Sequence, residues 1–251
     1  MLKKFFAEFL ATAILVLIGC GTAMGVTFMN EAGTAAGVVA ISAAFGLAII
    51  VLAYTVGTIS GGHANPAVSF AKALNKEITW KEFGIYVAGQ VAGAFFGSLL
   101  LAMVFWSWGK GVAGQNGMSD IMIEAGKAAT NSTETNWFMT TMLSFMAEIG
   151  LTFLFVFLVL WVTNKKELGN KAGLLIALAL FAVHLVGTPL TGTSVNPARA
   201  LSPIIFSMFD GKDVGYKALC LIPSVLSPFM GSFVAATVYK AFNGKKEAKA
   251  E

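Results

Sequence analysis

The sequence predicts an all-α membrane protein with six transmembrane helices and two re-entrant half-helices, arranged as an inverted repeat of three spans plus three spans. Three observations lead to this prediction. The 251 residues are 57% hydrophobic and 12% charged, whereas a soluble domain has about 25% charged residues. The apolar residues form runs of the length, about 20 residues, that crosses a bilayer core. The same short motifs also occur in the same order in both halves of the chain.

Six apolar runs are long enough to be spans. They cover residues 5–29, 34–56, 83–106, 138–162, 172–186 and 218–241. The fifth is short as drawn, and we expect it to extend at either end. The first run follows Lys3 and Lys4, as the apolar region of a signal peptide would. Because Glu8 interrupts its start and the run continues to about Met29, we interpret it as the first transmembrane helix.

The distribution of lysines predicts the orientation in the membrane. An even number of spans places both ends of the chain on one side. Twelve of the lysines then share that side, and four lie opposite, Lys110, Lys127, Lys212 and Lys217. Cytoplasmic loops carry the excess of positive charge, so both termini are predicted to be cytoplasmic and residues 107–137 to form an extracellular loop. The net charge of +4 fits this topology signal, and no nucleic-acid partner is expected.

The two halves of the chain share three elements. Residues 7–16 resemble residues 147–156, VGT occurs at 56–58 and 186–188, and NPA follows at 65–67 and 196–198. We expect a first repeat over 1–106 and a second over 138–251, which includes a cytoplasmic tail. Three spans per repeat reverse the chain direction, so the repeats are inverted. Inverted repeats place a functional site near the bilayer midplane.

Each NPA begins a short apolar stretch, 65–74 or 196–206, that cannot span a bilayer. Asparagine is a favoured N-cap and proline suits the first helical position. The stretches are therefore predicted to be half-helices that enter from opposite faces and meet. Irregular backbone at this depth needs surrounding protein or a water-filled cavity. The predicted site lies where the two motifs meet, at Asn65, Pro66, Ala67 and Asn196, Pro197, Ala198.

Arg199 is the single arginine of the chain and follows the second NPA in an apolar region. An ionisable residue inside a span costs ~3 kcal/mol or more and usually faces a cavity. A guanidinium stays charged and offers several donors in a rigid fork, which lysine does not reproduce. We expect Arg199 to face a cavity between the helices; the alternative is a structural ion-pair partner.

The segments SGGHANPAV (60–68) and TSVNPAR (193–199), with Glu8 and Glu148, resemble the aquaporins of the major intrinsic protein family, most closely the bacterial-type water channels. The resemblance covers about residues 5–241. It implies an aquaporin-like fold with one pore per subunit, a homotetramer in the bilayer of the cytoplasmic membrane, and passive, osmotically driven water flux that excludes protons and ions. It implies no enzymatic activity and no cofactor. It places the selectivity constriction at Phe45, His184, Thr193 and Arg199.

The resemblance and the repeat also assign supporting residues. Glu8 and Glu148 are expected to face inward and accept hydrogen bonds from backbone N–H groups of the loops, and His63 to hold its loop. No metal site is predicted, because His63 and His184 lack a third ligand. Simpler interpretations remain: Phe45 as core packing, His184 as an interior histidine, and the glutamates near lipid headgroups.

Two features favour water over larger solutes. His184 with Arg199 predicts a tight polar constriction, and Ala200 stands where glycerol channels of the family usually carry Asp. An aquaglyceroporin-like channel for glycerol or other small neutral solutes stays open, since Ser224 and Val225 replace an aromatic pair typical of water channels. An ion-coupled secondary transporter would need a coupling carboxylate at Glu8 or Glu148. A membrane enzyme using His63 or His184 would lack a nucleophile–base pair.

Overall fold

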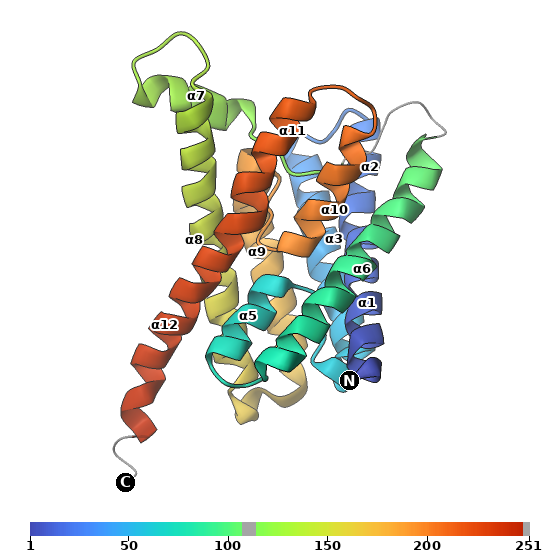
Figure 1. Cartoon of the computed structure of the whole chain (residues 1–251), viewed down its shortest axis with the longest axis vertical. Helices are drawn as coiled ribbons and strands as arrows, with labels where there is room; N and C mark the ends of the chain where they lie inside the picture. The colour runs from blue at the N-terminus through green and yellow to red at the C-terminus, as the bar shows by residue number, and fades with distance from the viewer. Residues whose placement is uncertain (107–113, 248–251) are drawn as a thin grey trace.

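The computed structural model describes residues 1–106 and 114–247, and this part of the chain is helical without strands. Its described residues contain six helices long and apolar enough to cross a membrane (Figure 1). The predicted all-α membrane fold is therefore confirmed. The spans are built from α1 (Leu2–Leu15) with η1 (Val16–Cys20) and α2 (Gly21–Phe28), α3 (Ala35–Tyr54), α6 (Trp80–Trp106), α8 (Trp137–Thr163), α9 (Ala172–Thr191), and α11 (Val214–Leu221) with η3 (Ile222–Leu226) and α12 (Ser227–Glu247).

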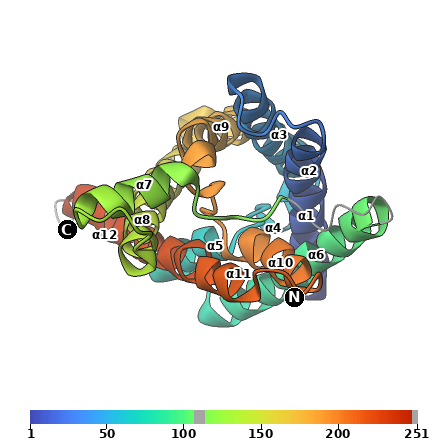
Figure 2. The same ribbon diagram turned by 90° about the horizontal axis from the view of Figure 1, so that it is seen from above.

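The half-helices are α5 (Pro66–Leu74) and α10 (Pro197–Met208), each beginning directly after its asparagine. The long helices pack in equivalent pairs in the two halves: α1 lies against α6, and α8 lies against α12. The halves meet where α3 packs on α9. Seen from above, the long helices form a ring (Figure 2).

The fifth span, which was expected to extend beyond 172–186, continues to Thr191 through Pro189, and η2 (Lys166–Lys171) precedes it. One detail differs from the sequence-based expectation. The expected extracellular loop contains α7 (Asp120–Ala129), whose N-cap Ser119 accepts a hydrogen bond from the Met122 N–H. The first VGT opens the short α4 (Gly57–Ser60), whereas the second lies inside α9. Residues 107–113 of the loop and 248–251 of the tail lie outside the described residues.

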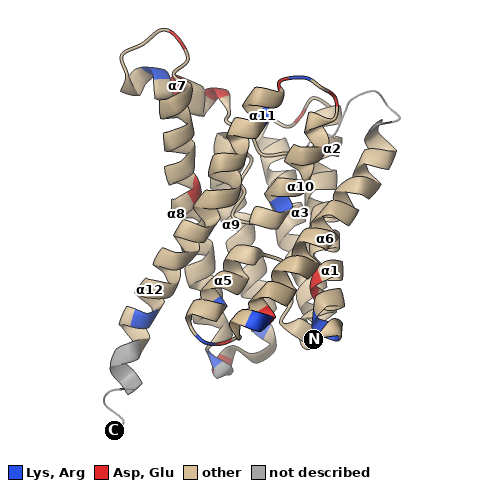
Figure 3. Ribbon diagram, in the orientation of Figure 1, with Lys and Arg blue, Asp and Glu red and all other residues tan. Residues whose placement is uncertain are grey.

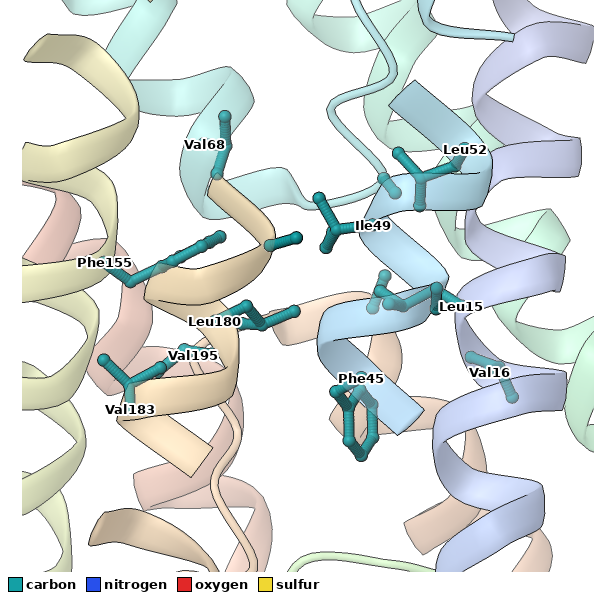
Figure 4. Packing of buried hydrophobic residues seen from close by; sticks show 14 of the residues in the cluster. Leu15, Val16, Phe45, Ile49, Leu52, Val68, Phe155, Leu180, Val183 and Val195 are labelled. Atoms are coloured by element: carbon teal, nitrogen blue, oxygen red, sulfur yellow. The ribbon is translucent and has the colours of Figure 1, made fainter. Parts of the chain in front are cut away.

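A buried apolar core surrounds the point where the half-helices meet. Side chains from α1, α3, α8 and α9 converge there (Figure 4). The core includes Leu15, Val16, Phe45, Ile49, Leu52, Val68, Phe155, Leu180, Val183 and Val195. The core thus holds both re-entrant loops between the long helices.

The small-residue face of α6 packs directly on the backbone of α1. A Cβ atom added at Gly93 would collide with the carbonyl oxygen of Phe9, and one at Gly89 would lie 2.6 Å from that of Phe5. Close helix contact of this kind requires glycine.

Replacing Gly93 with valine is expected to separate α1 from α6 and to destabilise the protein by about 1–3 kcal/mol or more. The measurement is the thermal unfolding midpoint in detergent. Gly84→Val is the matched control, because a Cβ at Gly84 meets no atom within 4 Å. Equal midpoints for the two variants would contradict the prediction.

Candidate pore and its constriction

The two NPA asparagines cap the half-helices. Asn65 Oδ1 accepts a hydrogen bond from the Ala67 N–H at 2.8 Å. Asn196 Oδ1 accepts from the N–H groups of Ala198 at 3.1 Å and Arg199 at 3.2 Å. These bonds satisfy backbone donors that a helix start otherwise leaves without partners. The residues of both motifs thus lie where the sequence predicted, at the N-termini of two half-helices.

The same asparagines also join the two loops to each other. Asn65 Nδ2 donates to the Val195 carbonyl at 2.8 Å, and Asn196 Nδ2 donates to the Ala64 carbonyl at 2.7 Å. Ala64 and Val195 have φ values of 48° and 44°. This left-handed backbone is unfavourable for residues with a Cβ, most of all for a β-branched one, and costs of order 1–3 kcal/mol. The reciprocal bonds stabilise this backbone, so each loop supports the other.

Glu8 is fully buried and supports the first loop. Its Oε1 accepts from the Ser60 hydroxyl at 2.6 Å and the His63 N–H at 3.0 Å. Its Oε2 accepts from the Ala64 N–H at 2.8 Å and from Gln90 Nε2 at 2.7 Å. Charge-assisted bonds of this kind are about twice as strong as neutral ones. The structure therefore places Glu8 inside the bundle against the loop backbone, not among headgroups.

Glu148 occupies the equivalent position for the second loop and is also fully buried. Its Oε1 accepts from the Thr191 hydroxyl at 2.5 Å and the Ser194 N–H at 2.7 Å. Its Oε2 accepts from the Val195 N–H at 3.0 Å. Each repeat thus contributes one carboxylate from its first span to its own re-entrant loop.

His63 lies in a polar network beside the first half-helix. Its Nδ1 is 3.0 Å from the Ser69 hydroxyl, and its ring centre is 4.8 Å from that of Tyr86. Gln90 Nε2 donates to the same Ser69 hydroxyl at 2.9 Å. Sequence reasoning missed Gln90; the available signal was an uncharged amide within an otherwise apolar span, which needs a buried partner.

Three of the four predicted constriction residues come together. The rings of Phe45 on α3 and His184 on α9 stack with centres 4.2 Å apart, and the guanidinium carbon of Arg199 lies 4.8 Å from the Phe45 ring centre. All three side chains are buried. Thr193 is also buried, but its hydroxyl lies toward Gly187 of α9. The ring pair and the cation thus form one compact polar and aromatic group.

Hydrogen bonding fixes the tautomer of His184. Its Nδ1 lies 2.9 Å from the Leu180 carbonyl, which can only accept, so Nδ1 carries the hydrogen. Nε2 is then an acceptor, and it is buried without a partner among the described residues. Arg199 Nε and the Thr193 hydroxyl are likewise buried and unpartnered there. The constriction therefore presents both acceptor and donor atoms that a passing polar molecule can use.

A narrow cavity of about 10 Å³ connects the constriction to the NPA asparagines. Its polar lining includes His63, Asn65, His184, Asn196 and Arg199; its apolar lining includes Leu15, Ile49, Phe155 and Leu180. A space of roughly 10–15 Å³ is about the minimum for one water molecule. The cavity therefore has room for about one water molecule.

Asn116, which sequence reasoning missed, holds Arg199. One terminal nitrogen of Arg199 donates to Asn116 Oδ1, and the other donates to the Gly192 carbonyl at 3.2 Å. Asn116 Nδ2 donates in turn to the Thr191 carbonyl at 3.2 Å. The only sequence signal was indirect: a buried guanidinium requires acceptors, and the loop between the third and fourth spans contains several asparagines.

Replacing Asn116 with alanine is expected to lower water permeability several-fold, because Arg199 loses an acceptor worth about 1–3 kcal/mol and can move across the constriction. Stopped-flow light scattering on proteoliposomes measures this. Asn116→Asp retains an acceptor oxygen and should retain permeability; Asn131→Ala, an exposed loop asparagine, is the control. Unchanged permeability of Asn116→Ala would show that Arg199 is held without it.

The departure at Ser224 and Val225 lies in η3. The Ser224 carbonyl accepts a hydrogen bond from the Ser194 hydroxyl, and neither Ser224 nor Val225 lines the narrow cavity. Ser224 therefore supports the second loop from outside the narrow cavity.

Comparisons with known proteins agree with this geometry. The family model for the major intrinsic proteins matches residues 1–239. The chain is 32% identical to Aquaporin Z of Rhodopseudomonas palustris over 96% of this chain and 93% of the relative, and 34% identical to Aquaporin Z of Bradyrhizobium diazoefficiens over 95% and 92%. The crystal structure of the aquaglyceroporin from Plasmodium falciparum shares the fold, with a TM-score of 0.71, 21% identity and 95% coverage of both chains. The chain belongs to the major intrinsic protein family, whose members are membrane channels and not enzymes.

Proposed function

We propose that this chain forms a passive water-selective channel that carries osmotically driven water across the cytoplasmic membrane. The observation that supports this most directly is the cavity of about 10 Å³ between the two asparagines and the Arg199–His184 pair. It has room for one water molecule, whereas glycerol is several times larger. Water would pass in single file, with donors and acceptors on the polar side and weakly interacting apolar side chains elsewhere.

Proton exclusion follows from the meeting of the half-helices. Each helix N-terminus carries roughly +0.5 elementary charge, which opposes a cation at the centre of the pore. Each asparagine amide has two N–H donors, and one is used to bond the opposite loop. The second can donate to a water oxygen, which then turns its own hydrogens away. A chain of waters oriented in this way cannot relay a proton through the centre.

The constriction supplies the second barrier. Arg199 keeps its charge and repels cations, while His184 Nε2 can accept a hydrogen bond from water. A hydrated ion would have to lose its shell here in exchange for few partners. Donor and acceptor arrangement, pore width and an electrostatic barrier are the properties that set selectivity in such pores.

Glycerol transport is the second candidate function. The P. falciparum neighbour is named an aquaglyceroporin, but its 21% identity supports a common fold alone. The relatives named Aquaporin Z are more similar in sequence. Ion-coupled transport is less favoured, because the oxygens of Glu8 and Glu148 already accept hydrogen bonds from the loops.

Osmotic shrinkage of proteoliposomes, followed by stopped-flow light scattering, tests the proposal. With an impermeant osmolyte, we expect shrinkage much faster than in empty liposomes. With glycerol, we expect the same shrinkage and no fast re-swelling. Fast re-swelling would identify a glycerol channel, and a pH gradient dissipated by the protein would contradict proton exclusion.

We further propose a homotetramer with both termini cytoplasmic, and two repeats over 1–106 and 138–251. Most of the lysines drawn, together with the N-terminus, lie at one end of the bundle, as expected for a cytoplasmic face (Figure 3). Cross-linking in membranes and thiol labelling of a cysteine placed in the tail would test oligomeric state and orientation.

A further inference from the structure

A basic and aromatic cleft lies outside the pore, between the end of α8, α12 and the segment after α5. The end of α8 and the segment after α5 lie at the end of the bundle that carries the N-terminus (Figure 1). It consists of two cavities of about 540 Å³ and 580 Å³ that share Asn164, Tyr239 and Asn243 in their walls. We call it the basal cleft. Its walls are formed by Trp161 of α8, by Asn164, Lys165 and Glu167 after this helix, by Tyr239, Lys240, Phe242 and Asn243 of α12, and by residues 75–77 after α5.

The basal cleft contains three lysines whose charge is not neutralised. Lys76, Lys165 and Lys240 line it, and none forms an ion pair among the described residues. Lys240 Nζ donates to the Leu74 carbonyl at 2.7 Å, and Lys165 Nζ lies 5.5 Å from the Trp161 ring centre. Each contact fixes the position of a lysine ammonium group but does not neutralise its positive charge.

Two carboxylates also lie in the walls. Glu77 is already bound: its Oε2 accepts from Lys72 Nζ at 2.6 Å, and its Oε1 accepts from Asn164 Nδ2 at 3.1 Å. Glu167 lines the same cavity as Lys165. With Glu77 paired to Lys72, the three lysines outweigh Glu167, so the cleft favours an anion.

Asn75 provides an independent sign of a ligand. It lines the second cavity, and both polar atoms of its side-chain amide are buried without a partner among the described residues. Buried polar groups nearly always have a partner. An amide donor beside several lysines suits the oxygens of a phosphate group.

The other wall of the cleft is aromatic and marks the edge of the membrane. Trp161 lies 6.0 Å from Tyr239 and 6.3 Å from Phe242, ring centre to ring centre. Trp and Tyr concentrate at the level of lipid headgroups. Phe157, 6.5 Å from Phe242, continues the apolar surface between α8 and α12. If the phosphate group of a phospholipid lay in the cleft, the acyl chains of that lipid would lie beside these rings.

We propose that the basal cleft binds an anionic phospholipid, with its phosphate among Lys76, Lys165, Lys240 and Asn75 and its acyl chains along the aromatic surface of α8 and α12. Basic pockets between transmembrane helices are suited to such headgroups. The proposal does not depend on which solute passes through the pore.

The test is titration of the delipidated protein in detergent with phosphatidylglycerol, and with phosphatidylcholine of the same acyl chains, followed by native mass spectrometry. The variant is the triple substitution Lys76→Gln, Lys165→Gln, Lys240→Gln. The matched control is Lys3→Gln, Lys81→Gln, Lys171→Gln, which removes the same charge from the same end but leaves the cleft walls unchanged. Asn75→Asp adds a negative charge to the cleft and keeps all lysines.

We expect the wild type to bind phosphatidylglycerol at least tenfold more tightly than phosphatidylcholine. At about fivefold per lysine near the surface, the triple variant should lose most of this preference, and the control should lose little. Asn75→Asp should weaken phosphatidylglycerol binding and not phosphatidylcholine binding, which keeps the test valid if the triple variant does not fold. If the triple variant and the control lost the preference for phosphatidylglycerol equally, the basal cleft would not be the binding site. If millimolar inorganic phosphate displaced the lipid, a phospholipid would not be the occupant.

Discussion

Replacing Glu148 with alanine is expected to abolish water permeability. The substitution leaves the Thr191 hydroxyl and the N–H groups of Ser194 and Val195 buried without their acceptor. Each unsatisfied donor costs about 1–3 kcal/mol, and the Val195 backbone is already strained. The loop should then leave its native shape, which removes Asn196 and Arg199 from the pore.

Stopped-flow measurements and the thermal midpoint of the purified protein would be compared for Glu148→Ala, Glu148→Gln and Glu134→Ala. Glutamine retains one acceptor oxygen but directs an amide donor at other donors, so an intermediate loss is expected. Glu134 is exposed in the loop between α7 and α8 and is the control. A Glu148→Ala protein that folds and conducts like the wild type would show that the loop does not need the carboxylate.

Replacing His184 with alanine is expected to raise glycerol permeability at least tenfold while water permeability is retained. The imidazole stacks on Phe45 and borders the narrow cavity, so its loss widens the passage beside Arg199. Discrimination by pocket size is worth about 1–3 kcal/mol, or 10–200-fold. The second barrier, at the asparagines, remains intact, so proton exclusion should persist.

Glycerol re-swelling rates of proteoliposomes provide the measurement. Val183→Ala is the matched control, since Val183 is a buried neighbour on α9 that does not line the narrow cavity. If both variants exclude glycerol as the wild type does, His184 does not set the width of the pore.

Local patterns made the framework predictable. Span length and hydropathy identified the six long helices, and Asn-Pro placed the starts of α5 and α10 at the correct residues. These features depend on neighbours a few positions apart. The helix α7 was missed because a loop rich in glycine and polar residues conceals a short amphipathic helix whose buried side is small.

The residues that support the site were less predictable. Asn116 meets Arg199 across 83 positions of sequence, and Gln90 meets Glu8 across 82. Nothing near Asn116 distinguishes it from the other asparagines of the loop, because its partner is brought to it only by the packing of α6, α9 and α10. The glutamates were predictable for a different reason: the internal repeat places them at matching positions.

The exchange of hydrogen bonds between Asn65 and Val195 and between Asn196 and Ala64 has a consequence for biosynthesis. The first re-entrant loop emerges from the ribosome long before the segment that completes it. Until the second NPA arrives, the amide of Asn65 and the carbonyl of Ala64 lack these partners. The centre of the pore can therefore form only after the second NPA has been synthesised, and a nascent chain that ends before residue 195 lacks both of these bonds.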